Sequence, residues 1–122
     1  MQNLEQIRAR HVLEFATKHG ARVTGDQGGE VIKKISPIIM NHGLLAAMAY
    51  SFTEKEGWQL VFDAIARHLS SPEIAVVPPA AADREKLIEH LTRENTTSET
   101  LKRATNETMA WLEYARRFVK RG

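Results

Sequence analysis

The stretch ISPIIMNHGLLAAMAYSFT, residues 35–53, decides the fold because it contains no charged side chain. A helix that crosses a membrane needs about 20 consecutive apolar residues, and this run is interrupted by Pro37 and by the turn Asn41-His42-Gly43. Both pieces are too short to span a bilayer. A charge in a protein core would lose its hydration without gaining a partner. The stretch therefore predicts two helices that are buried on several sides and joined at Gly43.

Apolar residues recur at helical spacing on both sides of this stretch, and capping residues stand where helices are expected to begin. Asn3 predicts the start of the first helix, and Asp83 predicts the start of a short helix late in the chain. Pro37 lacks an amide donor and is expected to kink or break the second helix. The predicted helices cover residues 4–19, 30–41, 44 to about 53, 58–69, 84–94 and 99–120, and an irregular proline-rich connection covers 70–83. We therefore predict an all-α fold, a compact bundle of about five to six helices forming a single domain over residues 1–122.

The composition is that of an ordinary intracellular domain. A chain of 122 residues can bury roughly two thirds of the surface of its unfolded form. Because the sequence has no cysteine, it has no disulfide, no cysteine-ligated metal and no thiol nucleophile. The N-terminal residues MQNLEQIRAR carry charges where a secretory signal would be apolar. We expect a cytoplasmic protein without an export signal.

Candidate catalytic and metal-binding residues are few. Asn41-His42 could act as a catalytic pair, but Asn and His are common beside glycine at helix ends, and no acid lies nearby in the sequence. The histidines lack the spacings by which one helix face offers two metal ligands. Residues 20–25 begin like a phosphate loop, but Asp26-Gln27 stand where a lysine and a hydroxyl residue are required. We predict a protein that is not an enzyme and that uses no cofactor or metal.

The charges are unevenly distributed, although the net charge is only +2. The middle of the chain is net acidic, whereas both ends are net basic. On the last predicted helix Arg103, Arg117 and Arg121 fall on one side, opposite the apolar stripe and next to Tyr114. Arginine donates to two phosphate oxygens at once and stacks on bases, so this row suits a nucleic-acid backbone. A solvated face with cations near a helix C-terminus would give the same row.

Several sequence elements together resemble a known family. They are LEQIRARHVLEFA at the start, a Lys-Lys-x-x-Pro helix at 33–37, an Asn-x-Gly-Leu turn at 41–44, an alanine-rich helix followed by one led by Gly57-Trp58, and a closing helix with Arg-Ala-Thr, Ala-Trp-Leu and Arg-Arg-Phe. In this order and spacing they resemble the small helical subunit of the type III-B CRISPR effector, the Cmr complex. The resemblance covers most of the chain and is weakest in its acidic, proline-rich middle.

The resemblance implies a non-catalytic helical protein of which several copies stack along a guide RNA–target RNA duplex in antiviral defence. Its partners would be that duplex, the other Cmr effector subunits and further copies of itself, without a membrane. We expect it to follow the RNA backbone with little preference for sequence. The residues that we expect to contact phosphates are Lys33, Lys34, Arg103, Arg117, Lys120 and Arg121, with Arg8, Arg10, Lys18 and Arg22 as a second group. The alternative is a helical adaptor that binds a protein partner through an apolar groove or its acidic middle and never meets RNA.

Overall fold

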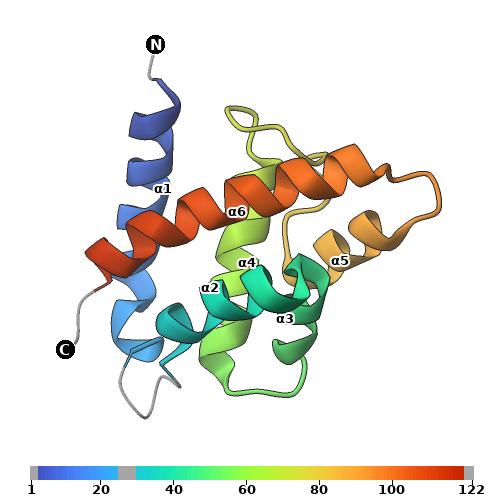
Figure 1. Ribbon diagram of the computed structural model, residues 1–122. Coiled ribbons are helices and arrows are strands. Elements are labelled where there is room, and N and C mark those ends of the chain that lie inside the picture. The colour runs from blue at the N-terminus through green and yellow to red at the C-terminus, as the bar shows by residue number, and fades with distance from the viewer. Residues whose placement is uncertain (1–2, 25–29, 120–122) are drawn as a thin grey trace.

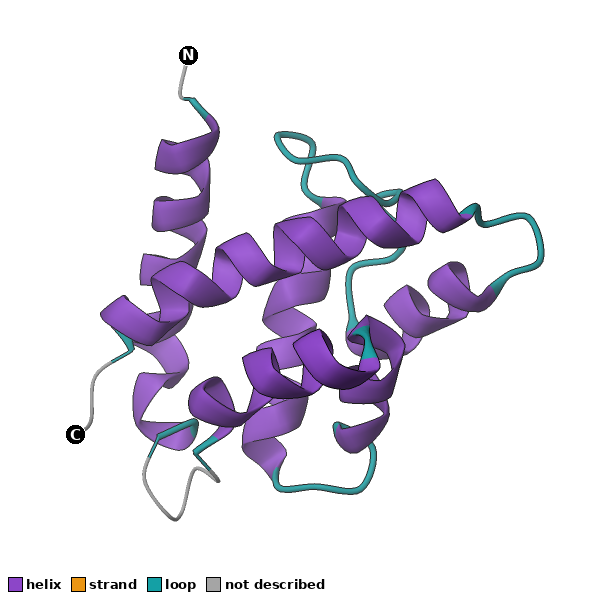
Figure 2. Ribbon diagram, viewed as in Figure 1, coloured by secondary structure: helices purple, strands orange, loops and turns teal. Residues whose placement is uncertain are grey.

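The computed structural model describes residues 3–24 and 30–119, and over these ranges the chain forms six α-helices, one short 3-10 helix and no strand. The elements are α1 (Leu4–His19), η1 (Gly20–Arg22), α2 (Val31–His42), α3 (Leu44–Tyr50), α4 (Glu56–Ser70), α5 (Arg84–Thr92) and α6 (Ser98–Phe118). Figure 2 shows helices joined by loops throughout the described part of the chain. The predicted all-α fold is confirmed.

The C-terminal helix α6 holds the bundle together by packing against α1, α2 and α4. Figure 1 shows it running across the molecule from the side of α5 to the side of α1. Its inward residues recur at three- and four-residue steps and are buried; they are Ala104, Thr108, Trp111, Leu112 and Ala115. The ring of Trp111 meets that of Phe15 on α1 edge to face, with 5.3 Å between their centroids. This contact joins the first helix of the chain to the last.

The helices begin where the sequence places capping side chains. The side chain of Asn3 accepts a hydrogen bond from the Gln6 amide, and the Gln6 side chain accepts one from the Asn3 amide. This reciprocal pair satisfies two amide donors that the first turn of a helix leaves free. Asp83 caps α5 and Thr97 caps α6, each by accepting a hydrogen bond from the backbone amide three residues later. The predicted starts at Asn3 and Asp83 are therefore confirmed.

Gly43 forms the corner between α2 and α3. Its backbone has φ of 95° and ψ of 164°, a conformation open almost only to glycine, and its amide donates to the Ile39 carbonyl over 2.8 Å. The expected corner at Gly43 is confirmed. Of the kink or break expected at Pro37, the break is wrong, because α2 continues through this residue. Pro37 lies on the exposed side of α2, where the carbonyl left without an amide donor can reach water.

The uncharged stretch 35–53 is buried on one side only. The inward residues are Ile35, Ile39, Leu44, Ala47 and Met48, each at most 4% exposed. We call Met40, Tyr50 and Phe52 the outer apolar residues, because they are 75%, 43% and 45% exposed. The prediction of burial on several sides is wrong for them. The absence of charge in residues 35–53 therefore reflects an exposed apolar surface as well as a buried core.

Candidate nucleic-acid interface

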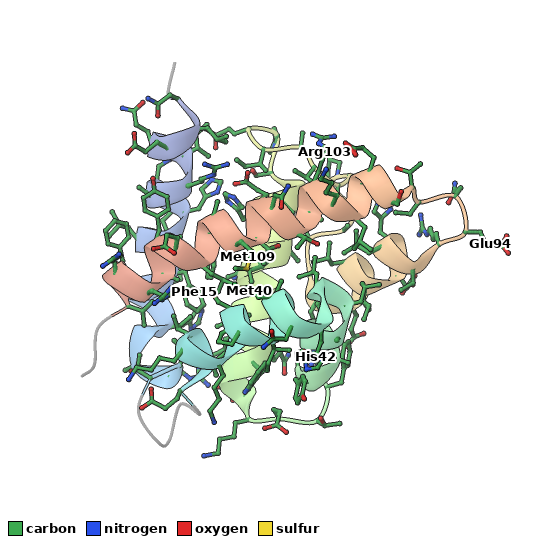
Figure 3. All side chains as sticks on the ribbon, viewed as in Figure 1. Phe15, Met40, His42, Glu94, Arg103 and Met109 are labelled. Atoms are coloured by element: carbon green, nitrogen blue, oxygen red, sulfur yellow. The ribbon has the colours of Figure 1, made fainter. Side chains whose placement is uncertain are left out.

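The cations predicted to contact phosphate on α2 and α6 lie on the surface. Lys33 and Lys34 stand in the first turn of α2, and Arg103 and Arg117 stand on α6; all four are exposed. Figure 3 shows Arg103 on the outer side of α6. Exposed guanidinium and ammonium groups keep donors available for a phosphate oxygen. Lys120 and Arg121 lie outside the described residues.

The fold brings the beginning of α2 close to the end of α6. A hollow of about 280 Å³ is lined by Lys33 from α2 and by Arg116 from α6, together with Val23, Thr24, Glu30, Ile32 and Val119. Arg116 was missed by the sequence prediction because it lies off the arginine row on the helical wheel. It is exposed, and with Arg117 it contacts Glu113 only at 3.6–3.7 Å. We call Lys33, Lys34, Arg116 and Arg117 the α2–α6 basic surface.

The predicted contacts on α1 and η1 are mostly engaged within the molecule. Arg10 donates to both carboxylate oxygens of Glu73 at 2.6 Å, and Arg22 forms an ion pair with Glu56. Arg8 is bound to Glu107. Lys18 is exposed, and it forms no ion pair within the described residues. Of the second predicted group, Lys18 keeps the most freedom to meet a phosphate.

Glu107 is the centre of a buried polar network that sequence spacing did not reveal. Arg8 donates through Nε and Nη2 to its two oxygens at 2.8 and 2.7 Å. His68 of α4, whose side chain is fully buried, contacts the same carboxylate through Nε2 at 2.8 Å. On its other side His68 Nδ1 lies 2.8 Å from His11 Nδ1. The network therefore joins α1, α4 and α6.

The positions of the protons in this network follow from its acceptors. The carboxylate of Glu107 can only accept, so His68 donates through Nε2. In a neutral His68, Nδ1 then accepts, and His11 donates to it through its own Nδ1. The remaining nitrogen of a neutral His11, Nε2, carries a lone pair and lies 3.4 Å from a Glu73 oxygen. On the Glu107 side each hydrogen-bond donor faces an acceptor. On the Glu73 side two acceptors, His11 Nε2 and the carboxylate, face each other without a proton between them.

The surroundings shift the pKa values of these groups. Burial raises the pKa of Glu107, but the hydrogen bonds and charges of Arg8 and His68 outweigh it and lower the value from 4.5 to about 2. Burial lowers the pKa of His11 from its ordinary value, and the nearby charges of His68 and Arg10 lower it further, against the opposing effect of Glu73 and Glu14. Glu107 is therefore ionised and His11 neutral near pH 7.

The alternative sites gain no support from their surroundings. His42 is exposed at the end of α2, and Asn41 beside it is exposed as well. Among the described residues, no group of three or more His, Cys, Asp or Glu side chains could hold a metal ion. No helix in ranges 3–24 and 30–119 is long and apolar enough to cross a membrane. The absence of catalysis and of a cofactor stays a prediction.

A comparison with protein-family models matches residues 4–121 to the family described as CRISPR-associated protein (Cas_Cmr5). The chain belongs to this family. Comparisons with curated proteins and with solved structures gave no significant match. The Cas_Cmr5 family is the small subunit of the type III-B Cmr complex, and it is known as a non-catalytic subunit. Membership confirms the resemblance seen in the sequence and implies association with other Cmr subunits.

We expect this Cas_Cmr5 protein to lose stability in acid through Glu107. Because folding lowers the pKa of this carboxyl group from 4.5 to about 2, its contribution is complete above the unfolded value and is lost as the pH falls between the two. The Glu107→Gln variant cannot ionise, so its urea midpoint should change less than that of the wild type between about pH 5 and pH 3. Glu113→Gln, on the exposed side of α6, is the control. Equal changes in all three proteins would contradict the assignment.

Proposed function

We propose that the chain is a non-catalytic subunit that lies along the guide RNA–target RNA duplex of a Cmr effector and contacts its phosphates. The observation that carries the proposal is the α2–α6 basic surface, where Lys33 and Arg116 from distant parts of the sequence line one hollow. Its cations are exposed, and the ion pairs of Arg116 and Arg117 are long and lie at the surface. Such pairs contribute little to stability, so phosphates can replace the carboxylate at small cost.

Contact through phosphates explains how one surface can serve every guide sequence. Arginine binds two phosphate oxygens at once, and lysine adds a flexible point charge. Neither group reads a base when it contacts the backbone, so sequence recognition is left to pairing between guide and target. Each phosphate contact releases a counterion, so binding weakens as salt rises. Several copies along one duplex would add such contacts together.

Stacking of several copies is supported by apolar side chains that the fold leaves outside. Leu13 of α1 is 50% exposed, and the outer apolar residues lie on the stretch from α2 to the turn after α3. Exposed apolar side chains such as these are available to a protein partner, which would bury them on contact. We propose that these residues contact a neighbouring copy or another Cmr subunit. The role that we propose for such an assembly is antiviral defence in the cytoplasm.

A helical adaptor without RNA binding is the second candidate, and the outer apolar residues are the observation that favours it. The two functions differ in their response to salt. Phosphate contacts lose affinity steeply as salt rises, whereas a mainly apolar interface does not.

Charge reversal on the α2–α6 basic surface tests the RNA contact. We expect a Lys33→Glu/Arg117→Glu variant to assemble at least about tenfold more weakly with guide-loaded effector and target RNA, since two attractive contacts become repulsive. Its thermal stability should stay close to that of the wild type, because both residues are exposed. Assembly is measured by gel shift at several salt concentrations.

The matched control is a Lys86→Glu/Arg93→Glu variant, which makes the same charge change on the exposed surface in and just after α5. It should assemble like the wild type. Unchanged assembly of the test variant, or an equal loss in the control, would overturn the assignment of this surface.

A further inference from the structure

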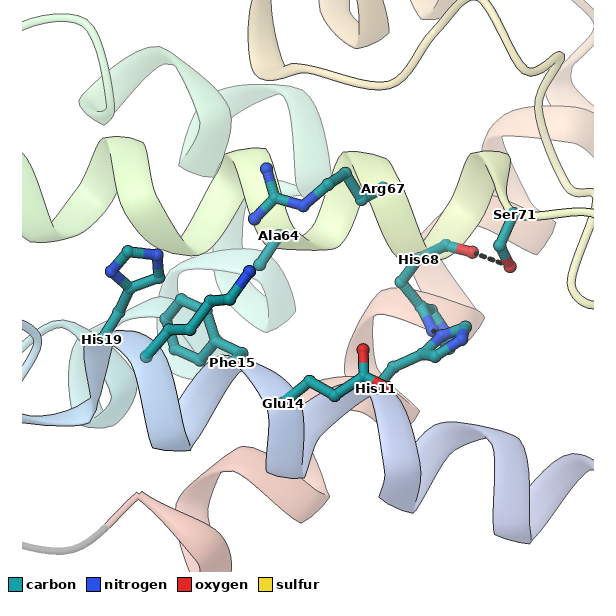
Figure 4. A pocket seen from close by; sticks show the side chains of 9 residues that line it. His11, Glu14, Phe15, His19, Ala64, Arg67, His68 and Ser71 are labelled. Atoms are coloured by element: carbon teal, nitrogen blue, oxygen red, sulfur yellow. Dashed lines mark hydrogen bonds between the residues drawn. The ribbon is translucent and has the colours of Figure 1, made fainter.

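A cleft of about 170 Å³ lies between α1 and α4, and no residue of the α2–α6 basic surface lines it. Its lining residues are His11, Glu14, Phe15, Lys18, His19, Ala64, Arg67, His68 and Ser71. Figure 4 shows Arg67 extending along α4 toward His19, with Glu14, His11 and His68 farther along the cleft and Phe15 between. Pockets that enclose drug-sized ligands measure roughly 300–1,000 Å³. This cleft therefore admits a small group that belongs to a longer molecule more readily than a whole ligand.

One end of the cleft carries the cations Lys18 and Arg67. Arg8, Arg10 and Arg22 are each paired with a carboxylate, as described above. Lys18 and Arg67 are exposed and form no ion pair with a described residue. Cations that converge on a concave surface attract an anion more strongly than the same cations on a flat one.

His19 supplies a second, independent sign of a missing partner at this end. Its Nδ1 atom is buried and has no hydrogen-bond partner within the described residues. A buried polar atom of this kind is rare and marks a place for a water or a ligand. Burial, with the charges of Arg22, Arg67 and Lys18, lowers the pKa of His19 against the opposing effect of Glu56. An anion bound there would cancel that field and let the ring donate through both nitrogens.

The other side of the cleft carries a carboxylate. Glu14 is exposed beside it and can only accept hydrogen bonds when ionised. It repels a second negative charge and accepts from a hydroxyl group. The cleft thus offers donors for a phosphate at one end, the edge of Phe15 in the middle and an acceptor for a hydroxyl beyond it.

We propose that this cleft binds one ribonucleotide unit of an RNA strand, with the phosphate against Lys18, His19 and Arg67 and a ribose hydroxyl toward Glu14. The assignment rests on the proposed function only in naming RNA as the source of the unit. The 2′-hydroxyl is the group by which proteins distinguish RNA from DNA, so the cleft favours ribose over deoxyribose. It supplies an RNA contact made by residues other than those of the α2–α6 basic surface.

The test is an NMR titration of the full chain with a ribonucleoside 5′-monophosphate, its 2′-deoxy form, inorganic phosphate and a short single-stranded RNA. We expect saturable shifts of the His19 ring signals with the ribonucleotide and with the RNA, and weaker apparent affinity for the deoxy form and for inorganic phosphate. Lys18→Ala and Arg67→Ala should each weaken binding by about tenfold, as expected for one lost charge-assisted contact. Glu14→Ala, which removes the acceptor for the hydroxyl, should reduce the preference for ribose.

Lys86→Ala and Arg93→Ala are the matched controls and should leave the titration unchanged. The proposal is overturned by an unshifted His19 ring, by shifts that survive both Lys18→Ala and Arg67→Ala, or by equal binding of inorganic phosphate and the ribonucleotide. Failure here is distinct from failure of the proposed function, because assembly of the Lys33→Glu/Arg117→Glu variant is measured separately and involves none of these residues.

Discussion

The Glu107→Ala variant should lose about 3 kcal/mol of its free energy of unfolding, the low end of the range for breaking a buried ion pair. The side chain of Glu107 is only 10% exposed, and that of His68 is fully buried. Removing the carboxylate leaves His68 with a buried N–H that has no acceptor, and it leaves the Arg8 guanidinium without its partner. Urea denaturation at pH 7 measures the loss.

Glu113→Ala is the matched control, because it makes the same substitution on the solvent side of the same helix. Its pairs with Arg116 and Arg117 are long and exposed, so the change should stay within about 0.5 kcal/mol. Glu107→Gln should fall between the two, since its amide oxygen still accepts one hydrogen bond. A Glu107→Ala variant as stable as Glu113→Ala would mean that the network does not hold α1, α4 and α6 together.

The Trp111→Ala variant should lose about 3–5 kcal/mol, the usual cost of deleting a large buried aromatic side chain. Trp111 is 1% exposed, and its ring packs against Phe15. The substitution removes the apolar contact and leaves a cavity between α1 and α6. Thermal and urea unfolding, followed by circular dichroism, give the measurement.

Two further variants show whether this loss comes from packing. Trp111→Phe keeps an aromatic ring beside Phe15 and should lose less than Trp111→Ala. Met40→Ala removes a side chain that is 75% exposed and should cost less than about 0.5 kcal/mol. If Met40→Ala were as harmful as Trp111→Ala, the division of α2 and α6 into inner and outer faces would be wrong.

The helices could be predicted from the sequence because the local signals agree with the global fold. Asn3, Asp83 and Thr97 each supply a side-chain acceptor at the start of an apolar-periodic segment, and each caps a helix. Gly43 could be placed at a corner because few other residues adopt its backbone angles. These features depend on neighbours within a few positions, which a sequence displays directly.

The outer side of α2 and α3 could not be separated from the inner side by the absence of charge. Periodicity distinguishes a buried face from an exposed one only where the exposed face is polar, and here Met40, Tyr50 and Phe52 are apolar as well. Two of these side chains, Tyr50 and Phe52, are partly covered by contacts within the molecule. Tyr50 stacks on Trp58 with 5.5 Å between centroids, and Arg84 lies 4.3 Å from the centre of the Phe52 ring.

The network around Glu107 and the cleft beside it are beyond the reach of sequence spacing. Rules of spacing find pairs on one helix face, whereas His11 and His68 lie 57 positions apart and meet only because α1 packs on α4. The same holds for Lys33 and Arg116, which share a hollow across α2 and α6. The sequence could name individual cations as candidates, but it could not show which of them are paired with carboxylates. Among the described residues Arg8 is paired and Lys18 is not, and this difference arises only in the tertiary fold.

The bond between Arg8 and Glu107 joins residues 99 positions apart, and this distance has a consequence for synthesis. The ribosome releases α1 first and α6 last, so the first helix leaves the exit tunnel long before the helix that covers it. Until α6 emerges, Val12 and Phe15, which are buried in the finished fold, lack a major part of their cover. The bundle therefore cannot be completed until α6 has left the exit tunnel, and the inward side of α1 stays partly uncovered during that interval.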